Sequence, residues 1–327
     1  MPHLIIDDAI PYIRSVAERL GECTYLPGRE IRREHVRHAD ALIVRTRTKV
    51  DGALLAGSRV GFVATATIGF DHLDTAWLEA HGIGWTNCPD CNASSVAQYV
   101  AAAVAATRPT AAPATLGIIG LGHVGTAVAQ RFRAEGWRIL AYDPYKADAT
   151  ATLGEVLTLS DVITLHTPLT HSGDHPTYHM ASDDFFACIA EGSRRPIFVN
   201  AARGACMDTP AVEAAIAAGI VSAAVIDTWE DEPHIAPSLL QAAAIATPHI
   251  AGYSANGKAV ATRMALAAVA RHLGVPLDVS HIAPPPMPTG YRYDPLSDDA
   301  ALRRDPAAFE TLRAHYPLRW EETPLTL

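Results

Sequence analysis

The sequence predicts an α/β protein made of two doubly wound parallel-sheet domains, Rossmann-like or flavodoxin-like, followed by a short C-terminal segment. Three observations support this fold class. Short apolar runs alternate with amphipathic stretches, a rhythm typical of parallel strands joined by helices. The rhythm occurs in two series, and a glycine-rich loop opens the second series. The length of 327 residues suits about two domains.

The first series contains four apolar runs that we interpret as buried strands: HLIID, ALIVR, GFVAT and GIGWTN. An alanine-rich helix at 93–107 and the breaker RPTAAP separate this series from the second. A later helix, at 259–274, ends at Gly274 and is expected to return to the first series. These features predict a substrate-binding domain at residues 1–92 and 258–279.

The second series contains six apolar runs: LGIIG, RILAYD, VITLH, IFVNA, SAAVID and AIATPH. Together with the helix before them, they predict an NAD-binding domain at residues 93–257. The rest of the chain, 280–327, begins with APPPMPTG, a composition typical of a stiff linker. We expect this part to form a small, charged, helical segment.

Composition and charge limit the partners of this chain. The net charge of -9 argues against a general affinity for nucleic acid or anionic membranes. No run of about 18 apolar residues is present, and MPHLIIDDAIPYI lacks the basic leader of a signal or transit peptide. We therefore expect a cytoplasmic protein whose partners are small molecules, with no nucleic acid and no membrane.

Two clusters contain residue types that bind metals, but neither predicts a metal site. Cys88 and Cys91 have redox-motif spacing in CPDC, yet no second pair completes a zinc site, and the proline between them indicates a turn. Three histidines recur every four residues in HSGDHPTYH, but a glycine and a proline break any helix there. We predict a turn at CPDC, a polar loop at the histidines, and no bound metal at either.

A glycine-rich loop, GLGHVG, predicts the cofactor site. It lies directly after a predicted strand and at the start of a predicted helix. Gly120 permits a tight turn, Gly122 lets a pyrophosphate approach the backbone, and Gly125 lets helix and strand pack closely. The N–H groups of the first helical turn, which holds His123 and Val124, then face the anion.

The acid that follows the next strand predicts which dinucleotide binds. RILAYD ends at Asp143, close to the ~20-residue spacing expected for the residue that binds ribose. A carboxylate at this place would repel the 2′-phosphate of NADP. The sequence therefore favours NAD as the cofactor.

Residues that could do chemistry follow the last three predicted strands: Arg203 after IFVNA, Asp227 and Glu232 in DTWEDEP, and His249 after AIATP. Ligands of an open parallel sheet bind outside the carboxyl ends of its strands, so these side chains are expected at the cofactor edge. Oxidation of a 2-hydroxy acid needs a base, a cation for the carboxylate and a nicotinamide. A carboxylate beside His249 would raise its pKa and orient the ring. Position alone leaves the choice open among the three acids before the proline of DTWEDEP.

The motifs GLGHVG, HTPLT, NAARG, DTWEDEP and TPHIAG resemble those of the D-isomer-specific 2-hydroxyacid dehydrogenase family. In that family the acid directly before the proline is catalytic. The resemblance implies that Glu232 is the partner of His249 and that Arg203 is the substrate-binding cation. It also implies that Asp227 holds the nicotinamide amide, while the other two acids of DTWEDEP are solvated.

Further segments, such as ATATIGFDHLD, CNASSVAQYV and VRTRTKVDGALLAGS, are most similar to family members that oxidise 4-phosphoerythronate in the synthesis of vitamin B6. This resemblance implies oxidation of 4-phospho-D-erythronate to 2-oxo-3-hydroxy-4-phosphobutanoate. It implies substrate contacts by Thr46, Thr67 and Tyr253. It implies NAD contacts by Thr167 and Gly252.

The tail YDPLSDDAALRRDPAAFETLRAHYPLRWE is similar to part of the C-terminal dimerisation domain of the same family members, which implies a homodimer. It is shorter than that domain normally is. A second departure is Gln98, which stands where the family's SVAEY motif has glutamate. None of the predicted catalytic roles involves Gln98.

The phosphate of such a substrate needs cations or N–H groups. VRTRTKV offers Arg45, Arg47 and Lys49 after a predicted strand, and alternation along an extended segment would send them the same way. The tail offers three further arginines for this role, Arg292, Arg303 and Arg304.

The sequence is also compatible with two other functions. One is another D-2-hydroxyacid dehydrogenase, of the phosphoglycerate or glyoxylate type. The other is a non-catalytic NAD-sensing protein on the same scaffold, because a fold does not fix a function. The presence of Arg203, Glu232 and His249 argues against the second.

Overall fold

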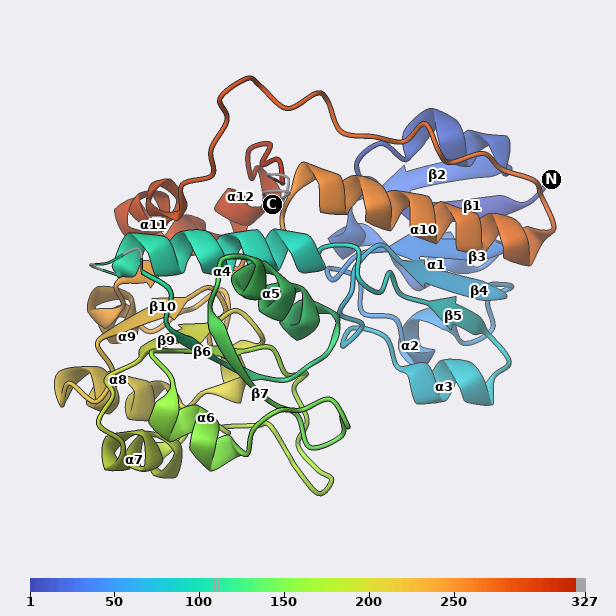
Figure 1. The fold of residues 1–327 in the computed structure, drawn as a ribbon. Coiled ribbons are helices and arrows are strands. Elements are labelled where there is room, and N and C mark those ends of the chain that lie inside the picture. Colours follow the sequence, from blue (N-terminus) through green and yellow to red (C-terminus); the bar gives the residue numbers. More distant parts are fainter. Residues whose placement is uncertain (109, 111, 322–327) are drawn as a thin grey trace. The chain divides into compact units, whose positions relative to one another are not determined.

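The structure is a computed structural model that describes residues 1–108, 110 and 112–321. Positions 109 and 111 of the predicted breaker RPTAAP, and residues 322–327 of the predicted C-terminal segment, lie outside the described residues. The chain forms two compact units (Figure 1), Met1–Asn92 with Ala255–Met287 and Ala93–Ser254 with Pro288–Leu327. Each unit contains one parallel sheet, so the predicted fold class is confirmed.

The first unit is built on a five-stranded parallel sheet in the order β2-β1-β3-β4-β5. Its strands are β1 (His3–Asp7), β2 (Glu22–Leu26), β3 (Ala41–Val44), β4 (Phe62–Thr65) and β5 (Gly84–Thr86). Its helices are η1 (Arg14–Arg19), η2 (Gly28–Glu30), α1 (Arg33–Val36), α2 (Gly52–Leu55), α3 (Thr75–Ala80) and α10 (Ala255–Leu273). This strand order is that of a flavodoxin-like sheet.

The central strands of the first unit bury apolar side chains on both faces. Leu4 and Ile6 of β1 pack in one layer with η1 and with Leu266 of α10. Ile5 of β1 and Leu42 of β3 pack on the opposite face with α1, α2 and α3. A strand covered on both faces has a nearly continuous apolar run, which is why these strands were predictable from the sequence.

One strand of this sheet, β2, was not predicted. It lies at the edge of the sheet next to β1, and its residues are half-buried or exposed. An edge strand needs no continuous apolar run, and the segment ECTYL has none. Its signal in the sequence is therefore weak.

The second unit is built on a six-stranded parallel sheet in the order β11-β10-β9-β8-β6-β7. Its strands are β6 (Thr115–Ile119), β7 (Arg138–Tyr142), β8 (Val162–Leu165), β9 (Ile197–Asn200), β10 (Ala223–Ile226) and β11 (Ile245–Ala246). The six predicted strands are thus confirmed. The sheet reverses its direction of growth between β6 and β8, the place where such sheets bind ligands.

Helices cover both faces of this second sheet. One layer holds α4 (Ala93–Thr107) and α5 (His123–Ala134), which pack on Leu116 and Ile118 of β6. The opposite layer packs on Ile163 of β8 and Phe198 of β9. Its helices are α6 (Leu153–Leu159), α7 (Asp183–Glu191), α8 (Thr209–Ala217) and α9 (Pro237–Ala242). A short helix, η3 (Gly204–Cys206), lies between β9 and α8.

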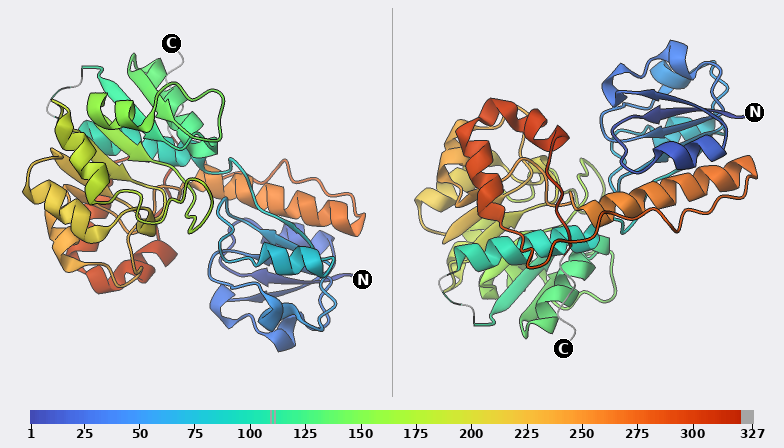
Figure 2. Two further views of the ribbon diagram at one scale, coloured as in Figure 1. Left: turned by 90° about the horizontal axis from the view of Figure 1, so that it is seen from below. Right: turned by 90° about the horizontal axis from the view of Figure 1, so that it is seen from above.

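The C-terminal segment packs on the second unit (Figure 2, red). It contains α11 (Pro295–Arg304), η4 (Pro306–Ala308) and α12 (Phe309–Ala314). Leu302 and Phe309 are fully buried in the layer that holds α6 to α9. The buried Arg319 donates hydrogen bonds to the carbonyl oxygens of Ser95 and Ala251. The segment is therefore a packed part of the unit rather than a loose tail.

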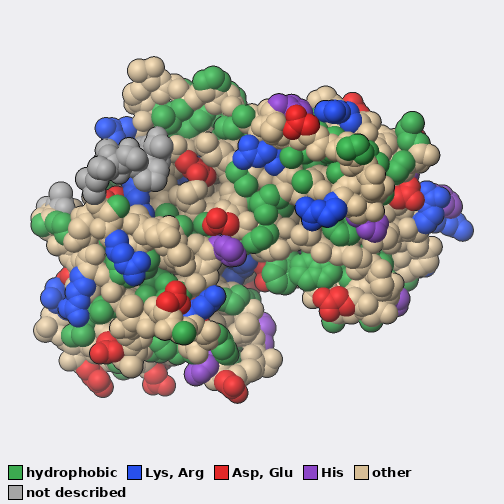
Figure 3. Space-filling view, turned by 45° about the vertical axis from the view of Figure 1, so that its right-hand side comes forward, with side chains coloured by type: hydrophobic (Ala, Val, Ile, Leu, Met, Phe, Trp, Pro, Cys, Tyr) green, Lys and Arg blue, Asp and Glu red, His purple; other side chains and the backbone are tan. Residues whose placement is uncertain are grey.

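The surface carries charges of both signs. On the face drawn in Figure 3, Lys and Arg side chains are interspersed with Asp and Glu side chains. Within the described part of the chain, each helix is too short or too polar to span a lipid bilayer.

Candidate active site

The glycine-rich loop of the second unit runs from β6 into α5. Gly120 has a φ of +96°, a left-handed conformation that favours glycine, and a Cβ there would meet the carbonyl group of His166. A Cβ at Gly125 would collide with the carbonyl oxygen of Gly120. Beside Gly122, at the N-cap of α5, there is open space where a side chain would lie. The backbone is therefore exposed at the point where a pyrophosphate would approach it.

Asp143 follows β7 and is tied to the glycine-rich loop. Its Oδ2 accepts a hydrogen bond from Leu121 N at 2.8 Å, and its Oδ1 accepts one from Tyr145 N at 3.0 Å. The carboxylate thus lies beside the first turn of α5, which begins at His123 and continues with Val124. A left-handed glycine, an open helix start and an adjacent carboxylate together fit a dinucleotide.

Glu232 and His249 lie in the loops after β10 and β11 and are hydrogen-bonded to each other. His249 Nδ1 is 2.8 Å from Glu232 Oε2, and Trp229 N donates to Glu232 Oε1 at 2.9 Å. Burial would raise the pKa of Glu232, but the charge and hydrogen bond of His249, the Trp229 N–H and the charge of Arg313 hold that pKa below its usual value. Glu232 therefore stays ionised near neutral pH and orients the imidazole through Nδ1.

Asp227 stabilises the turn that carries His249. Its buried carboxylate accepts hydrogen bonds from Thr247 Oγ1 (2.7 Å), Ile250 N (2.8 Å) and Ala251 N (3.0 Å). Burial raises the pKa of Asp227, although the charge of His249 and these hydrogen bonds oppose the rise. His249 has a φ of +54°, which is uncommon for a residue with a side chain. The bonds to Asp227 hold the turn in this conformation.

Arg203 lies in the loop after β9, and the buried side chain of Asn200 joins this loop to the one after β10. Asn200 Nδ2 donates to the carbonyl oxygens of Arg203 (3.1 Å) and Thr228 (3.4 Å). A Cβ at Gly204 would collide with the backbone of Trp229, so the two loops are in close contact. No role for Asn200 was predicted from the sequence. The signal was present, since a polar amide ends an otherwise apolar strand.

Three other predicted site residues lie in neighbouring loops of this unit. Thr167 follows β8, and its Oγ1 donates to Cys206 Sγ at 3.6 Å. Gly252 and Tyr253 belong to the turn that carries His249. The Tyr253 ring packs edge-on against the ring of Tyr316, with centroids 6.0 Å apart. The C-terminal segment therefore contacts a residue predicted to bind substrate.

Two predicted substrate residues, Thr46 and Thr67, belong to the first unit. Thr46 is exposed in the turn after β3. Thr67 follows β4, where its Oγ1 donates to the Gly69 carbonyl at 2.8 Å and lies 2.7 Å from Thr65 Oγ1. Both positions are at the carboxyl ends of their strands, where ligands of parallel sheets bind.

The basic residues near Thr46 do not lie on an extended strand, contrary to the expectation. β3 ends at Val44 and the chain then turns, so strand alternation cannot direct the three side chains. Arg45 Nη1 donates to the Ala9 carbonyl at 3.0 Å. Lys49 pairs with Asp51 at 2.9 Å and is 83% exposed, which makes it the least suited to bind phosphate.

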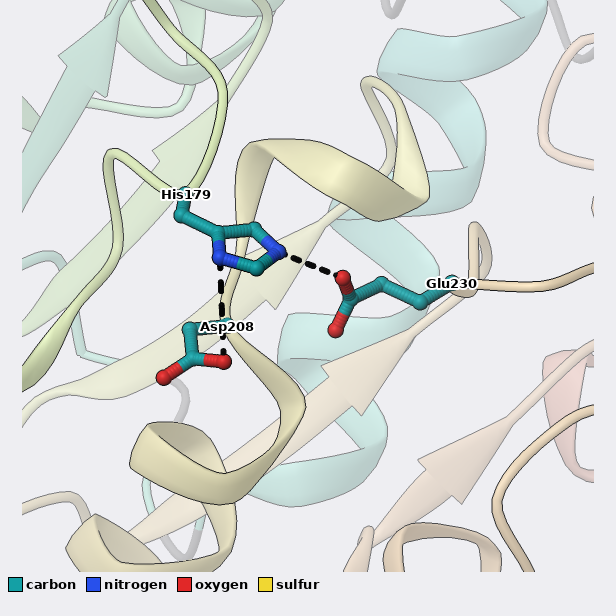
Figure 4. Close-up of side chains that lie close together, drawn as sticks. All are labelled: His179, Asp208 and Glu230. Carbon is teal, nitrogen blue, oxygen red and sulfur yellow. Dashed lines mark hydrogen bonds and ion pairs between the residues drawn. The ribbon is translucent and has the colours of Figure 1, made fainter.

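Glu230 is half-buried and hydrogen-bonded, whereas a solvated side chain was expected. His179 Nε2 lies 2.6 Å from Glu230 Oε1, and His179 Nδ1 lies 3.8 Å from Asp208 Oδ1 (Figure 4). Glu230 Oε2 also accepts a hydrogen bond from Thr209 N at 2.8 Å. His179, Asp208 and Glu230 are residue types that can bind a metal. The two acids, however, approach different ring nitrogens of His179, as expected for a histidine that bridges two carboxylates. Asp231, by contrast, is exposed as expected.

Residues 86–251 match the model of a protein family, the NAD-binding domain of the D-isomer-specific 2-hydroxyacid dehydrogenases. The chain belongs to this family of dehydrogenases. Over nearly its whole length it is similar to proteins named erythronate-4-phosphate dehydrogenase. The one from Bacteroides fragilis is 44% identical over 340 residues, covering 98% of this chain and 97% of the relative. The one from Porphyromonas gingivalis is 39% identical over 341 residues, covering 96% and 92%.

Solved structures of other dehydrogenases share the fold. D-lactate dehydrogenase from Aquifex aeolicus, complexed with NAD and lactic acid, has a TM-score of 0.70 and 25% identity, covering 83% of this chain and 96% of that one. The NAD⁺-bound 3-phosphoglycerate dehydrogenase of Entamoeba histolytica has a TM-score of 0.70 and 20% identity, covering 84% and 95%. The predicted family and the predicted cofactor, NAD, are confirmed. The roles of individual residues remain predictions.

Proposed function

We propose that this protein oxidises 4-phospho-D-erythronate to 2-oxo-3-hydroxy-4-phosphobutanoate with NAD, in the synthesis of pyridoxal 5′-phosphate. The observation that supports the chemistry is the hydrogen bond between Glu232 and His249. The substrate rests on the similarity to erythronate-4-phosphate dehydrogenases, which extends over 98% of the chain.

The proposed acid–base unit is the Glu232–His249 pair. Glu232 engages Nδ1 of the imidazole, which leaves Nε2 to accept the proton of the substrate's 2-hydroxyl group. The ionised Glu232 stabilises the imidazolium that results. Arg203 binds the substrate carboxylate and polarises the carbonyl group as it forms. NAD, when bound, supplies the acceptor for the hydride that leaves C2.

The proposed cofactor residues are all in the second unit. Backbone N–H groups of the glycine-rich loop would bind the pyrophosphate, and Asp143 would bind the adenosine ribose and exclude NADP. Thr167, Asp227 and Gly252 are proposed to complete the site. Among the described residues, Asp227 Oδ2 accepts one hydrogen bond, from Ala251 N, so this oxygen retains capacity for the nicotinamide amide.

Substrate contacts, assembly and cellular location are proposed as well. Thr46, Thr67 and Tyr253 are proposed to contact the substrate, whose phosphate requires cations. The C-terminal segment is proposed to support a homodimer, which light scattering of the purified protein would test. The proposed location is the cytoplasm, which cell fractionation would test.

A second candidate is a D-2-hydroxyacid dehydrogenase with another substrate, because the fold is shared with D-lactate dehydrogenase. A non-catalytic NAD-sensing protein is a weaker candidate, since such a protein does not need the Glu232–His249 pair. Complementation separates these possibilities. A bacterial strain that lacks erythronate-4-phosphate dehydrogenase should grow without added pyridoxine when it expresses this chain, but not when it expresses His249→Ala at the same level. Failure of the well-expressed wild type to restore growth would contradict the proposed substrate.

A further inference from the structure

Arg313, in helix α12, brings a mostly buried positive charge to the predicted active-site loops. Its side chain is 11% exposed. The guanidinium carbon lies 5.7 Å from the centre of the Tyr253 ring and 5.8 Å from that of Phe309. The charge of Arg313 also helps to hold the pKa of Glu232 below its usual value, so the two groups are within electrostatic reach.

Few of the hydrogen-bond donors of Arg313 are used. Among the residues that the structure describes, its one hydrogen-bond partner is Glu310 Oε1, on the same helix, 3.3 Å from Nη1. The Nε atom is buried and lacks an acceptor within the described part of the chain. The guanidinium carbon lies over the rings of Tyr253 and Phe309, but a contact with a ring face does not take the place of an acceptor for each N–H group. Desolvated donors of this kind are costly unless an acceptor arrives.

The other arginines of the C-terminal segment are placed differently. Arg303 is bound to Asp299 and to two backbone carbonyl groups. Arg319 is buried against backbone groups of α4 and the turn after β11. Arg292 and Arg304 are exposed. Arg313 therefore differs from them in combining burial, spare donors and contact with Tyr253.

We propose that Arg313 binds the phosphate group of the substrate, so that the C-terminal segment contributes a cation to the substrate site of its own chain. This inference rests on the proposed function. A guanidinium edge matches the oxygen geometry of a phosphate and can donate two parallel hydrogen bonds. A dianion near the carboxylates of Glu232 and Asp227 would be repelled unless a cation lay beside it, and Arg313 supplies that cation.

The test compares Arg313→Gln and Arg313→Lys with a matched control, Arg195→Gln, which removes an exposed arginine elsewhere in the second unit. We expect Arg313→Gln to lower kcat/KM for 4-phosphoerythronate by about 10- to 100-fold, mainly through KM, which is the loss typical of a charged hydrogen bond. D-erythronate, which lacks the phosphate, should be oxidised at a nearly unchanged kcat/KM. Arg313→Lys should recover part of the loss, and Arg195→Gln should behave as the wild type.

A titration with inorganic phosphate keeps the inference independent of the substrate assignment. In calorimetry, phosphate should bind the wild-type protein in the presence of NAD and bind Arg313→Gln at least about 10-fold more weakly. If the wild type oxidised another 2-hydroxy acid but not 4-phosphoerythronate, the proposed function would be wrong. The titration would still test whether Arg313 binds phosphate, because it does not depend on turnover. Equal losses on D-erythronate and 4-phosphoerythronate would overturn the inference, as would equal phosphate binding by wild type and Arg313→Gln. If Arg313→Gln did not fold, the same comparisons would be made with Arg313→Lys, which keeps the charge but not the forked donor.

Discussion

Glu232 Oε2 and His249 Nδ1 lie 2.8 Å apart although the two residues follow different strands. The strands are β10 and β11, which are parallel neighbours in the sheet, so the loops at their carboxyl ends lie side by side. Trp229 N orients the carboxylate, and Asp227 holds the turn that carries the imidazole. The proposed acid–base pair is therefore assembled entirely within the second unit.

Removal of either member of this pair, or of Arg203, should abolish most activity. We expect Glu232→Gln and His249→Ala each to lower kcat/KM by about 10²- to 10⁴-fold, the range typical of a lost general acid–base group. Arg203→Ala should lower it by about 10²- to 10³-fold, the range typical of a lost donor that stabilises developing charge. Steady-state rates of NADH formation, with folding checked by circular dichroism, would measure this. A His249→Ala variant with wild-type kcat/KM would refute the proposed base.

Two neighbouring acids provide matched controls. Asp231→Asn should leave kcat/KM near that of the wild type, because Asp231 is exposed and asparagine tolerates its φ of +56°. Glu230→Gln should also have little effect, since glutamine keeps an oxygen that can accept the bond from Thr209 N. If either control were as damaging as Glu232→Gln, the assignment of Glu232 would be wrong.

Asp143 should determine the choice of cofactor. Asp143→Ala removes a carboxylate that would bind ribose and repel a 2′-phosphate, so we expect weaker binding of NAD and a smaller preference for NAD over NADP. Fluorescence titration of both reduced cofactors would measure the change. Asp148→Ala, an exposed acid of the same loop, is the control. Equal turnover of the wild type with NAD and NADP would contradict the role given to Asp143.

The basic turn after β3 should contribute to recognition of the substrate phosphate. We expect Arg45→Ala or Arg47→Ala to lower kcat/KM for 4-phosphoerythronate more than for D-erythronate, because a dianion needs cations. Lys49→Ala is expected to have the smallest effect of the three, since Lys49 is exposed and already paired with Asp51. If all three variants kept the wild-type ratio of the two kcat/KM values, this turn would have no phosphate role.

His72, in the first unit, should make stability depend on pH. Burial lowers its pKa from 6.5 to about 4, and its Nε2 lies 2.9 Å from Thr65 Oγ1. Between these pH values the unfolded chain takes up a proton that the folded chain excludes. The free energy of unfolding should therefore fall as the pH decreases from 6.5 to 4, by about 3 kcal/mol from this residue.

Urea titrations across this pH range would measure the dependence. His72→Gln should flatten it, whereas His38→Gln, a change at an exposed histidine, should not. An unchanged pH dependence in His72→Gln would show that His72 is not buried in its neutral form.

Much of the fold could be predicted because both sheets are covered on both faces. Strands such as ALIV in β3 and IFVN in β9 are fully buried and have continuous apolar runs. β2, at a sheet edge, has no such run and was missed. The glycines of the cofactor loop were recognisable because close approach and a left-handed φ impose glycine on the sequence.

Other contacts could not be predicted because they join residues far apart in the chain. The pairing of Glu230 with His179 joins two loops whose distance depends on the whole sheet. The contact of Arg313 with Tyr253 depends on how the C-terminal segment packs, which its composition does not determine. Asn200 differs from these, since its position at a strand end was visible and only its role was overlooked.

The most direct measurement of the central claim is the rate of NADH formation by the purified protein with a panel of three substrates. These are 4-phosphoerythronate, 3-phosphoglycerate and D-lactate, each at saturating NAD. We predict the highest kcat/KM for 4-phosphoerythronate. Over D-lactate, which lacks a phosphate, the margin should be at least about tenfold, because a site that holds a phosphate by charged hydrogen bonds discriminates by such factors. 3-Phosphoglycerate also carries a phosphate, so the preference over it tests the proposed substrate rather than phosphate binding alone. A higher kcat/KM for 3-phosphoglycerate or D-lactate, or no NADH formation with any of the three, would contradict it.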